Sequence, residues 1–123
     1  MTNDQLVEAI CELAADKKAL DIVEGDLRGV IDYTDFFVVC SGTSDRQVKA
    51  ISDGILYGMK QQHGVRPGRV EGLGQARWVL MDYLDVVVHI FVPELREYYD
   101  LERLWGEAPR TAFSRPPVPA LAT

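Results

Sequence analysis

The sequence predicts an α/β (α+β) fold in which helices cover a mixed β-sheet of about five strands. Three segments carry apolar residues at steps of three and four, the spacing of the buried side of a helix. Between them lie shorter apolar runs of strand length. Two of these runs are separated by only two residues, which is typical of an antiparallel hairpin. The predicted order is helix, two strands, helix, three strands and helix.

The first part of the chain is expected to form a helix and two strands. The helix covers residues 3–18, and Thr2 and Gln5 can form a capping box at its start. The segment Ala19–Asp26 follows as a strand. The run Asp35–Gly42 is apolar almost throughout, so we expect a strand that is buried on both faces of the sheet.

A second helix is expected directly after this buried strand. Ser44 and Gln47 can form another capping box, and Gly64 provides a stop for the helix. Gly54 and Gly58 lie inside this helix, where glycine lowers stability relative to alanine. Such glycines are compatible with close packing of a neighbouring element.

The hairpin lies in the second half of the chain. A short strand is expected at Arg69–Glu71, followed by strands at Trp78–Asp82 and Asp85–Phe91. Only Tyr83 and Leu84 separate the last two strands, which is the spacing of a tight turn.

The end of the chain is expected to hold a last helix and a tail. Pro93 can be the first residue of this helix, and Gly106 can close it. Residues 107–123 contain four of the six prolines and show no periodicity, so we predict a disordered C-terminal tail. Residues 1–106 then form the single domain that a chain of 123 residues allows.

Composition limits the classes of partner. The chain has 13 basic and 19 acidic residues, a net charge of −6. This balance argues against extensive binding of nucleic acid, which requires Lys and Arg for its phosphates. It suits a basic protein partner. The sequence has neither a signal-peptide pattern nor an apolar run of membrane-spanning length, so we expect a cytoplasmic protein that binds no membrane and keeps Cys11 and Cys40 as reduced core thiols.

Asp82, Asp85 and His89 are the first group to consider as an acid–base or metal site. The two aspartates flank the hairpin turn, where their carboxylates commonly accept hydrogen bonds from nearby backbone N–H groups. His89 lies four strand residues beyond Asp85, about 13 Å away, too far to share a metal ion. We therefore expect a structural hairpin or a binding edge, with His89 in the core and with no catalytic residue, metal or cofactor.

The turn Gly42-Thr43-Ser44 joins a strand to a helix, as some phosphate-binding turns do. It lacks the lysine and the full glycine pattern of a P-loop. Nucleotidyl transfer needs two carboxylates one residue apart on the following strand to hold Mg²⁺, and that pair is missing here. Helix capping explains Ser44 better, and a nucleotidyltransferase-like enzyme is kept as an alternative function.

The segment after Phe91 is rich in aromatic and large apolar residues. Tyr98 and Tyr99 point about 100° apart on a helix, so one buried stripe cannot contain both. Between Glu94 and Glu107 there are five acids and two bases. An exposed aromatic in this acidic setting would resemble an interface patch for a basic protein.

These residues, taken in order, resemble the ribosomal silencing factors of the Iojap family. The similarity covers about residues 5–106 and is carried by TDFFVV, GTS with a later KAI, EG, the run DVVVHIF and the ending YYxLExLW, which starts at Tyr98. One departure is Leu84, where the family usually has glycine in the hairpin. A left-handed Leu there costs on the order of 1 kcal/mol.

The resemblance implies a fold related to nucleotidyltransferases but without their catalytic acids, and a function that is not enzymatic. It implies binding to the large ribosomal subunit, through the ribosomal protein numbered fourteen on the intersubunit face. The bound factor would block the small subunit and repress translation when nutrients are scarce. It also implies that homodimers can form; a homodimeric adaptor without a ribosomal role is a further alternative.

The residues expected to contact the partner lie in two places. On the hairpin they are Trp78, Asp82 and Asp85, and on the last helix they are Tyr98, Tyr99 and Glu102. The acids would pair with Lys or Arg of the partner, and the aromatics would supply the desolvated centre.

Overall fold

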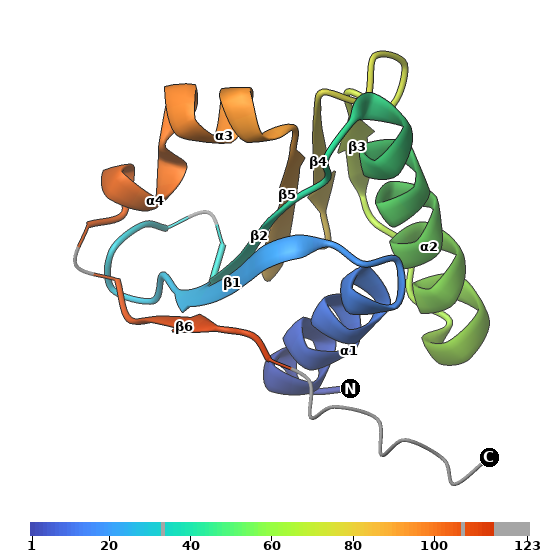
Figure 1. Cartoon of the computed structure of the whole chain (residues 1–123). Coiled ribbons are helices and arrows are strands. Elements are labelled where there is room, and N and C mark those ends of the chain that lie inside the picture. Colours follow the sequence, from blue (N-terminus) through green and yellow to red (C-terminus); the bar gives the residue numbers. More distant parts are fainter. Residues whose placement is uncertain (33, 107, 115–123) are drawn as a thin grey trace, which may run out of the picture.

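The computed structural model describes residues 1–32, 34–106 and 108–114 (Figure 1). Its elements, in chain order, are α1 (Asn3–Asp16), β1 (Leu20–Asp26), β2 (Phe36–Ser41), α2 (Asp45–His63), β3 (Arg69–Glu71), β4 (Trp78–Asp82), β5 (Val86–Phe91), α3 (Pro93–Tyr99), α4 (Leu101–Leu104) and β6 (Arg110–Ala112).

The described strands form one six-stranded sheet in the order β3-β4-β5-β2-β1-β6. The central pair β2 and β5 is parallel, and the other neighbouring pairs are antiparallel. This mixed sheet with helices on both faces confirms the predicted fold class. All residues of β2 and β5 are buried, as expected for strands at the centre of a covered sheet.

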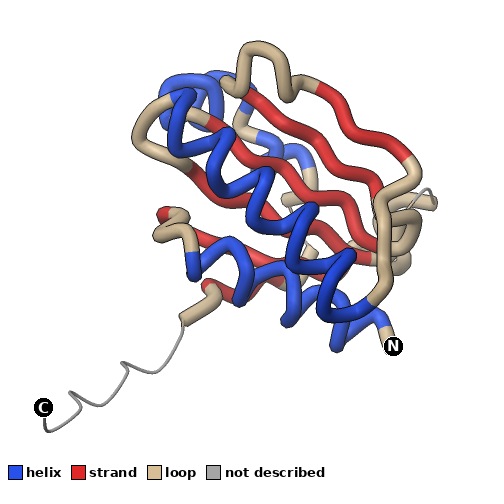
Figure 2. The backbone as a smooth tube through the Cα atoms, turned by 90° about the vertical axis from the view of Figure 1, so that its right-hand side faces the viewer, coloured by secondary structure: helices blue, strands red, loops and turns tan. Residues whose placement is uncertain are grey.

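Each face of the sheet has its own core. Figure 2 shows α1 and α2 in front of the strands, and their apolar residues pack with Val38, Val88 and other side chains of that face. The opposite face carries a smaller cluster that includes Phe37, Phe91 and Trp105. Because side chains alternate along a strand, neighbouring residues of β2 and β5 serve different cores.

The packing of α1 against α2 depends on the two helical glycines. A Cβ on Gly58 would collide with the side chain of Leu13, and one on Gly54 would come within 2.8 Å of Lys17. The close approach that these glycines allow is therefore present. The first capping box, Thr2 with Gln5, is also confirmed.

The second capping box forms only in part. Ser44 Oγ accepts a hydrogen bond from the backbone N–H of Gln47, as predicted, but Gln47 Oε1 accepts from the backbone of Thr43, at 2.6 Å. The amide nitrogen of Gln47 donates to the carbonyl of Lys18 at 3.0 Å, which ties the start of α2 to the turn that follows α1.

The last predicted helix is interrupted. Asp100 has a left-handed backbone, with φ of 45°, and separates α3 from α4. Aspartate tolerates this conformation better than most residues because its short polar side chain can bond locally. The interruption lets Tyr99 contact Trp78, while Trp105 packs on Phe37 with ring centroids 4.3 Å apart.

The prediction that residues 107–123 form a disordered tail is wrong for residues 108–114. This segment contains β6, which pairs with β1 and covers an edge of the sheet that would otherwise be unpaired. Ala108 is buried, and the N–H of Phe113 donates to the carbonyl of Ile22 at 2.8 Å. The sheet thus continues beyond the boundary expected at residue 106. Residues 107 and 115–123 lie outside the described residues.

Candidate docking face

The outer side of β4 is only partly covered by other elements. Val79 and Met81 are fully buried in the core formed with α1 and α2. Trp78, Leu80 and Asp82 alternate with them, are only partly buried, and therefore point to the other face. They run along the sheet from α3 to the hairpin turn. We define the docking face by these three residues together with Leu84, Asp85, Tyr98 and Tyr99.

Trp78 anchors the aromatic end of this face. Its ring lies 4.9 Å from the ring of Phe91 and 4.7 Å from that of Tyr99, measured between centroids. Its indole N–H donates to Nδ1 of His89 at 3.1 Å. Aromatic contacts of this kind contribute about 0.5–1.5 kcal/mol each beyond area burial. Trp78 is therefore held firmly, with part of its ring left accessible.

His89 is a core residue, as expected, and only 5% of its surface is exposed. Its Nδ1 accepts the indole hydrogen bond, so in the neutral ring the proton is on Nε2. Burial lowers the pKa of His89 from 6.5 to about 4, because the charged ring would lose its hydration. At neutral pH this side chain is an uncharged support for Trp78.

The hairpin turn forms the acidic end of the face. Asp82 Oδ1 accepts a hydrogen bond from the N–H of Leu84 at 2.8 Å, the local role expected for an aspartate at this position. Leu84 has φ of 75° and is 73% exposed, so it adopts the left-handed conformation despite its side chain. The carbonyl of Asp85 accepts from the backbone N–H groups of Asp35 and Phe36, which ties the turn to the start of β2.

The structure thus brings together only some of the predicted partner-binding residues. Trp78, Tyr98 and Tyr99 form one aromatic group, in which the two tyrosine rings meet edge to face at 5.1 Å. Asp82 and Asp85 lie at the other end of β4, about 13 Å along the strand. A partner would have to cover both ends to contact all five residues.

Glu102, the sixth predicted residue, lies apart from both groups and is engaged within the chain. Its Oε1 accepts a hydrogen bond from Nε of Arg96 at 2.9 Å, and the two side chains are only 23% and 15% exposed. By contrast, Tyr98 and Leu104 are 79% and 74% exposed. The outward surface of α3 and α4 therefore includes accessible apolar side chains among charged ones.

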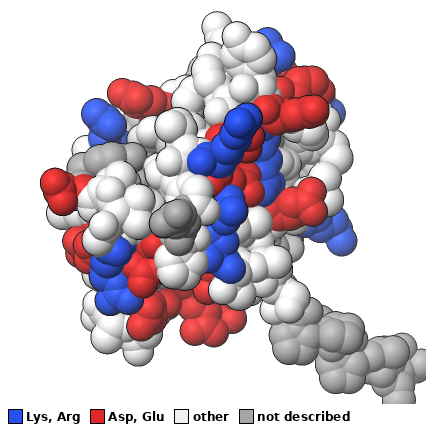
Figure 3. All heavy atoms as spheres, turned by 90° about the vertical axis from the view of Figure 1, so that its left-hand side faces the viewer, with Lys and Arg blue, Asp and Glu red and all other residues white. Residues whose placement is uncertain are grey.

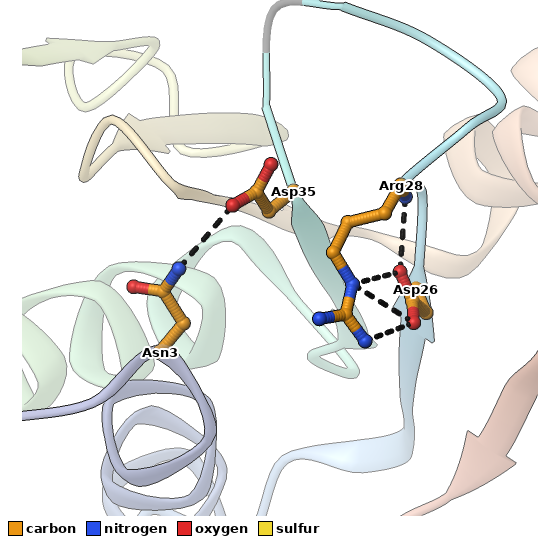
Figure 4. Close-up of polar contacts among 4 residues, drawn as sticks. All are labelled: Asn3, Asp26, Arg28 and Asp35. Atoms are coloured by element: carbon orange, nitrogen blue, oxygen red, sulfur yellow. Dashed lines mark hydrogen bonds and ion pairs between the residues drawn. The ribbon is translucent and has the colours of Figure 1, made fainter.

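Sequence reasoning missed a cavity on the other side of the molecule. It measures about 470 Å³ and is lined by both acidic and apolar residues, which include Asp4, Glu8, Glu24, Asp26, Phe36 and Phe113. Figure 4 shows the polar contacts beside it: Asn3 donates to Asp35 at 3.3 Å, and Arg28 binds both carboxylate oxygens of Asp26. No sequence motif marked it, because these residues come from α1, β1, β2 and the C-terminal segment.

Some side chains at this cavity have partners within the chain. Hydrogen bonds from Arg28 hold the pKa of Asp26 below its usual value, and the Arg28 guanidinium also lies over the ring of Phe36, 4.9 Å from its centroid. Cys11 Sγ lies 3.7 Å from an oxygen of Glu24, and burial raises the pKa of this thiol. Both cysteines are free and buried, as expected for core thiols.

Two negative findings concern the described part of the chain. No group of three or more His, Cys, Asp or Glu residues within it could hold a metal ion. None of its helices combines the length and apolar character needed to cross a membrane.

Tyr83 offers a test of the hairpin's packing. Its hydroxyl is buried and, among the residues that the structure describes, has no hydrogen-bond partner; burial raises its pKa to about 12. An unsatisfied buried hydroxyl costs free energy, so Tyr83→Phe is expected to keep the stability or to raise it by up to about 1 kcal/mol. Urea unfolding measures this, with the exposed Tyr57→Phe as control. A clear loss of stability in Tyr83→Phe would contradict the assignment of this hydroxyl as one without a hydrogen-bond partner.

Together, the fold and this face define a small α+β domain with an accessible aromatic and acidic surface. Comparison with known proteins identifies the family. The model of the family described as "Ribosomal silencing factor during starvation" matches residues 1–122, and the chain belongs to this family. The family assignment made from the sequence is therefore confirmed.

Individual relatives agree with the family model. The chain is 44% identical to the ribosomal silencing factor RsfS of Halalkalibacterium halodurans over 109 residues, which cover 89% of this chain and 92% of that protein. It is 43% identical to the RsfS of Bacillus subtilis over 105 residues, covering 85% and 86%. A crystal structure of a Chromobacterium violaceum protein superposes with a TM-score of 0.83 at 34% identity, covering 94% and 95% of the two chains.

Family membership makes the chain a ribosome-associated regulator of translation. The relatives carry the names of regulatory factors and not of enzymes, which agrees with the expectation of a non-enzymatic function and removes the nucleotidyltransferase-like alternative.

Proposed function

We propose that this protein binds the large ribosomal subunit through a basic protein of its intersubunit face, the ribosomal protein numbered fourteen. The observation that carries the proposal is the docking face, where accessible aromatic rings lie on the same surface as acidic side chains. Exposed aromatics in a well-supported setting are the residues that most often dominate binding energy. Acids at the rim would guide a basic partner.

The charge of the chain favours a protein partner over ribosomal RNA. With a net charge of −6, the chain is repelled by phosphate and attracted to basic proteins. Figure 3 views the side that carries α3 and α4, where Lys and Arg are interspersed with Asp and Glu among uncharged surface. Charged groups of this kind, surrounding uncharged surface, resemble the polar rim of a protein interface.

Repression requires no chemistry in this proposal. A domain of this length has a radius of gyration of about 13 Å, so a bound copy is large enough to separate two surfaces that must meet. The small subunit could not then join the large one, and translation would fall. Because the family is described as acting during starvation, we propose the same setting for this chain.

Subunit joining tests the proposal directly. Purified small and large subunits are mixed with increasing amounts of the protein and then separated by sedimentation. We expect fewer joined ribosomes and a large-subunit peak that contains the protein. An unchanged yield of joined ribosomes at saturating protein would refute the function.

A homodimeric adaptor without a ribosomal role is the second candidate, because a second copy could also cover the exposed Tyr98 and Leu104. Sedimentation of the protein alone distinguishes the two. A stable dimer that never appears in the large-subunit peak would favour the adaptor.

A further inference from the structure

A chain of polar contacts fastens α3 and α4 to the sheet. Arg96, in the last turn of α3, donates from Nε to Glu102 of α4 at 2.9 Å. Its Nη1 donates to the carbonyl of Asp21 at 2.8 Å and to Ser41 Oγ at 3.0 Å. Arg110 of β6 donates to the carbonyl of Glu102 at 2.8 Å. These contacts connect α3 and α4 with β1, β2 and β6.

The two helices need such fastening. They contain seven and four residues, and none of these residues is buried. Helices this short are marginal in water and depend on tertiary contacts. The left-handed Asp100 between them adds a point at which their relative orientation could change. The position of Tyr98 and Tyr99 therefore depends on contacts between this helical segment and the sheet.

The chemistry of Arg96 suits this task. Its planar guanidinium offers several donors in a fixed arrangement, so one side chain can bind a carboxylate and two other acceptors at once. Its side chain is only 15% exposed, which limits screening of the pair with Glu102 by water and salt. A lysine at this position would keep the charge but could not reproduce the same set of contacts.

We propose that Arg96 and Arg110 are positioning residues for ribosome docking, and that they act through Glu102 to hold α3 and α4 in the orientation that presents Tyr98 and Tyr99. This inference rests on the proposed function. It gives Glu102 an internal role in place of the direct partner contact expected from the sequence. It also makes β6, which the sequence placed in a disordered tail, part of the docking machinery.

The test compares full-length variants in binding to purified large subunits, together with hydrogen exchange of residues 93–105 in the free protein. Arg110→Ala and Arg96→Lys are expected to weaken binding about tenfold, the effect of losing a hydrogen bond to or from a charged group, and to accelerate exchange in α3 and α4. The matched control is Arg46→Ala, at an exposed position on α2, which should leave the exchange unchanged and should not weaken binding. Circular dichroism confirms that each variant is folded.

The direction of the change in affinity distinguishes a positioning role of Arg110 from a mere effect of its charge. Removing a positive charge from an acidic protein should strengthen its attraction to a basic partner. Weaker binding of Arg110→Ala, with Arg46→Ala unchanged or slightly stronger, therefore supports positioning. Wild-type affinity in both Arg110→Ala and Arg96→Lys would overturn the inference, as would weaker binding without faster exchange, because a direct contact would then explain the loss.

Failure of the proposed function would be recognised separately. If the unmodified protein does not bind large subunits, both the proposed function and the docking role of the two arginines are refuted. Hydrogen exchange in the free protein would still decide whether the network holds α3 and α4: faster exchange in the two variants supports the positioning, and unchanged exchange overturns it.

Discussion

Acidification from about pH 7 to pH 4 is expected to lower the free energy of unfolding by roughly 3 kcal/mol through His89 alone. The unfolded chain binds a proton at His89 below its ordinary pKa of 6.5, whereas burial lowers the folded pKa to about 4. Between these values the unfolded state binds more protons, so stability falls as the pH falls. The contribution of neutral His89 to the free energy of unfolding is fully present above pH 6.5 and is lost as the pH falls toward 4.

The hydrogen bond from Trp78 adds a structural reason for this loss. Nδ1 of His89 is the acceptor, and in the imidazolium both ring nitrogens carry protons. Protonation therefore places two donors against each other in a buried site and weakens the support of Trp78.

Unfolding in urea at a series of pH values, followed by far-ultraviolet circular dichroism, measures the effect. Carboxylates also titrate in this range, so the informative quantity is the difference between the unmodified protein and His89→Gln, which cannot titrate there. His63→Gln is the matched control because His63 is exposed at the end of α2. If His89→Gln keeps the full dependence of the unmodified protein, burial of His89 does not cause it.

The elements that could be predicted from the sequence are those whose signals are local. The capping box at Thr2, the stop at Gly64 and the strand at Trp78–Asp82 depend on residues close in the chain, and the structure confirms each of them. The central strands could be predicted for the same reason. A continuous apolar run has few options other than burial on both sides.

The β6 strand could not be predicted because its own residues do not show the pattern of a strand. Residues 107–123 are rich in proline, yet residues 110–112 need only an unpaired strand edge on β1 and two apolar anchors, Ala108 and Phe113. Pairing across such a separation is decided by the sheet and not by local propensity. The interruption at Asp100 escaped prediction similarly, since the apolar spacing continues through it.

The candidate site could be predicted in composition but not in arrangement. The sequence selected Trp78, Tyr98 and Tyr99, and the structure places them in contact. It also selected Glu102 as an acid for the partner, and no pattern indicated that Arg96, six residues earlier, would bind it. The aromatic and acidic residues also lie at opposite ends of the docking face. This separation depends on how β4 runs between α3 and the hairpin turn, which the residue types alone do not show.

Replacing Tyr98 by alanine is expected to weaken binding to large ribosomal subunits by roughly thirtyfold, which corresponds to about 2 kcal/mol for a central aromatic of an interface. Tyr98 is 79% exposed and contacts Tyr99 edge to face. Its removal should therefore leave the thermal stability of the free protein almost unchanged. The loss should appear mainly in the dissociation rate, because an apolar contact acts after encounter.

The acidic end of the docking face should respond differently. Asp85→Asn removes a charge from an exposed turn, so we expect the affinity to fall about two- to fivefold. This loss should lie mostly in the association rate and should be largely abolished by salt.

Tyr57→Ala is the matched control for Tyr98→Ala, since Tyr57 is 68% exposed on α2, behind the opposite face of the sheet. Surface plasmon resonance with immobilised large subunits resolves both rates. Equal losses in Tyr57→Ala and Tyr98→Ala would place the partner elsewhere, because only a contact confined to the docking face distinguishes these two exposed tyrosines.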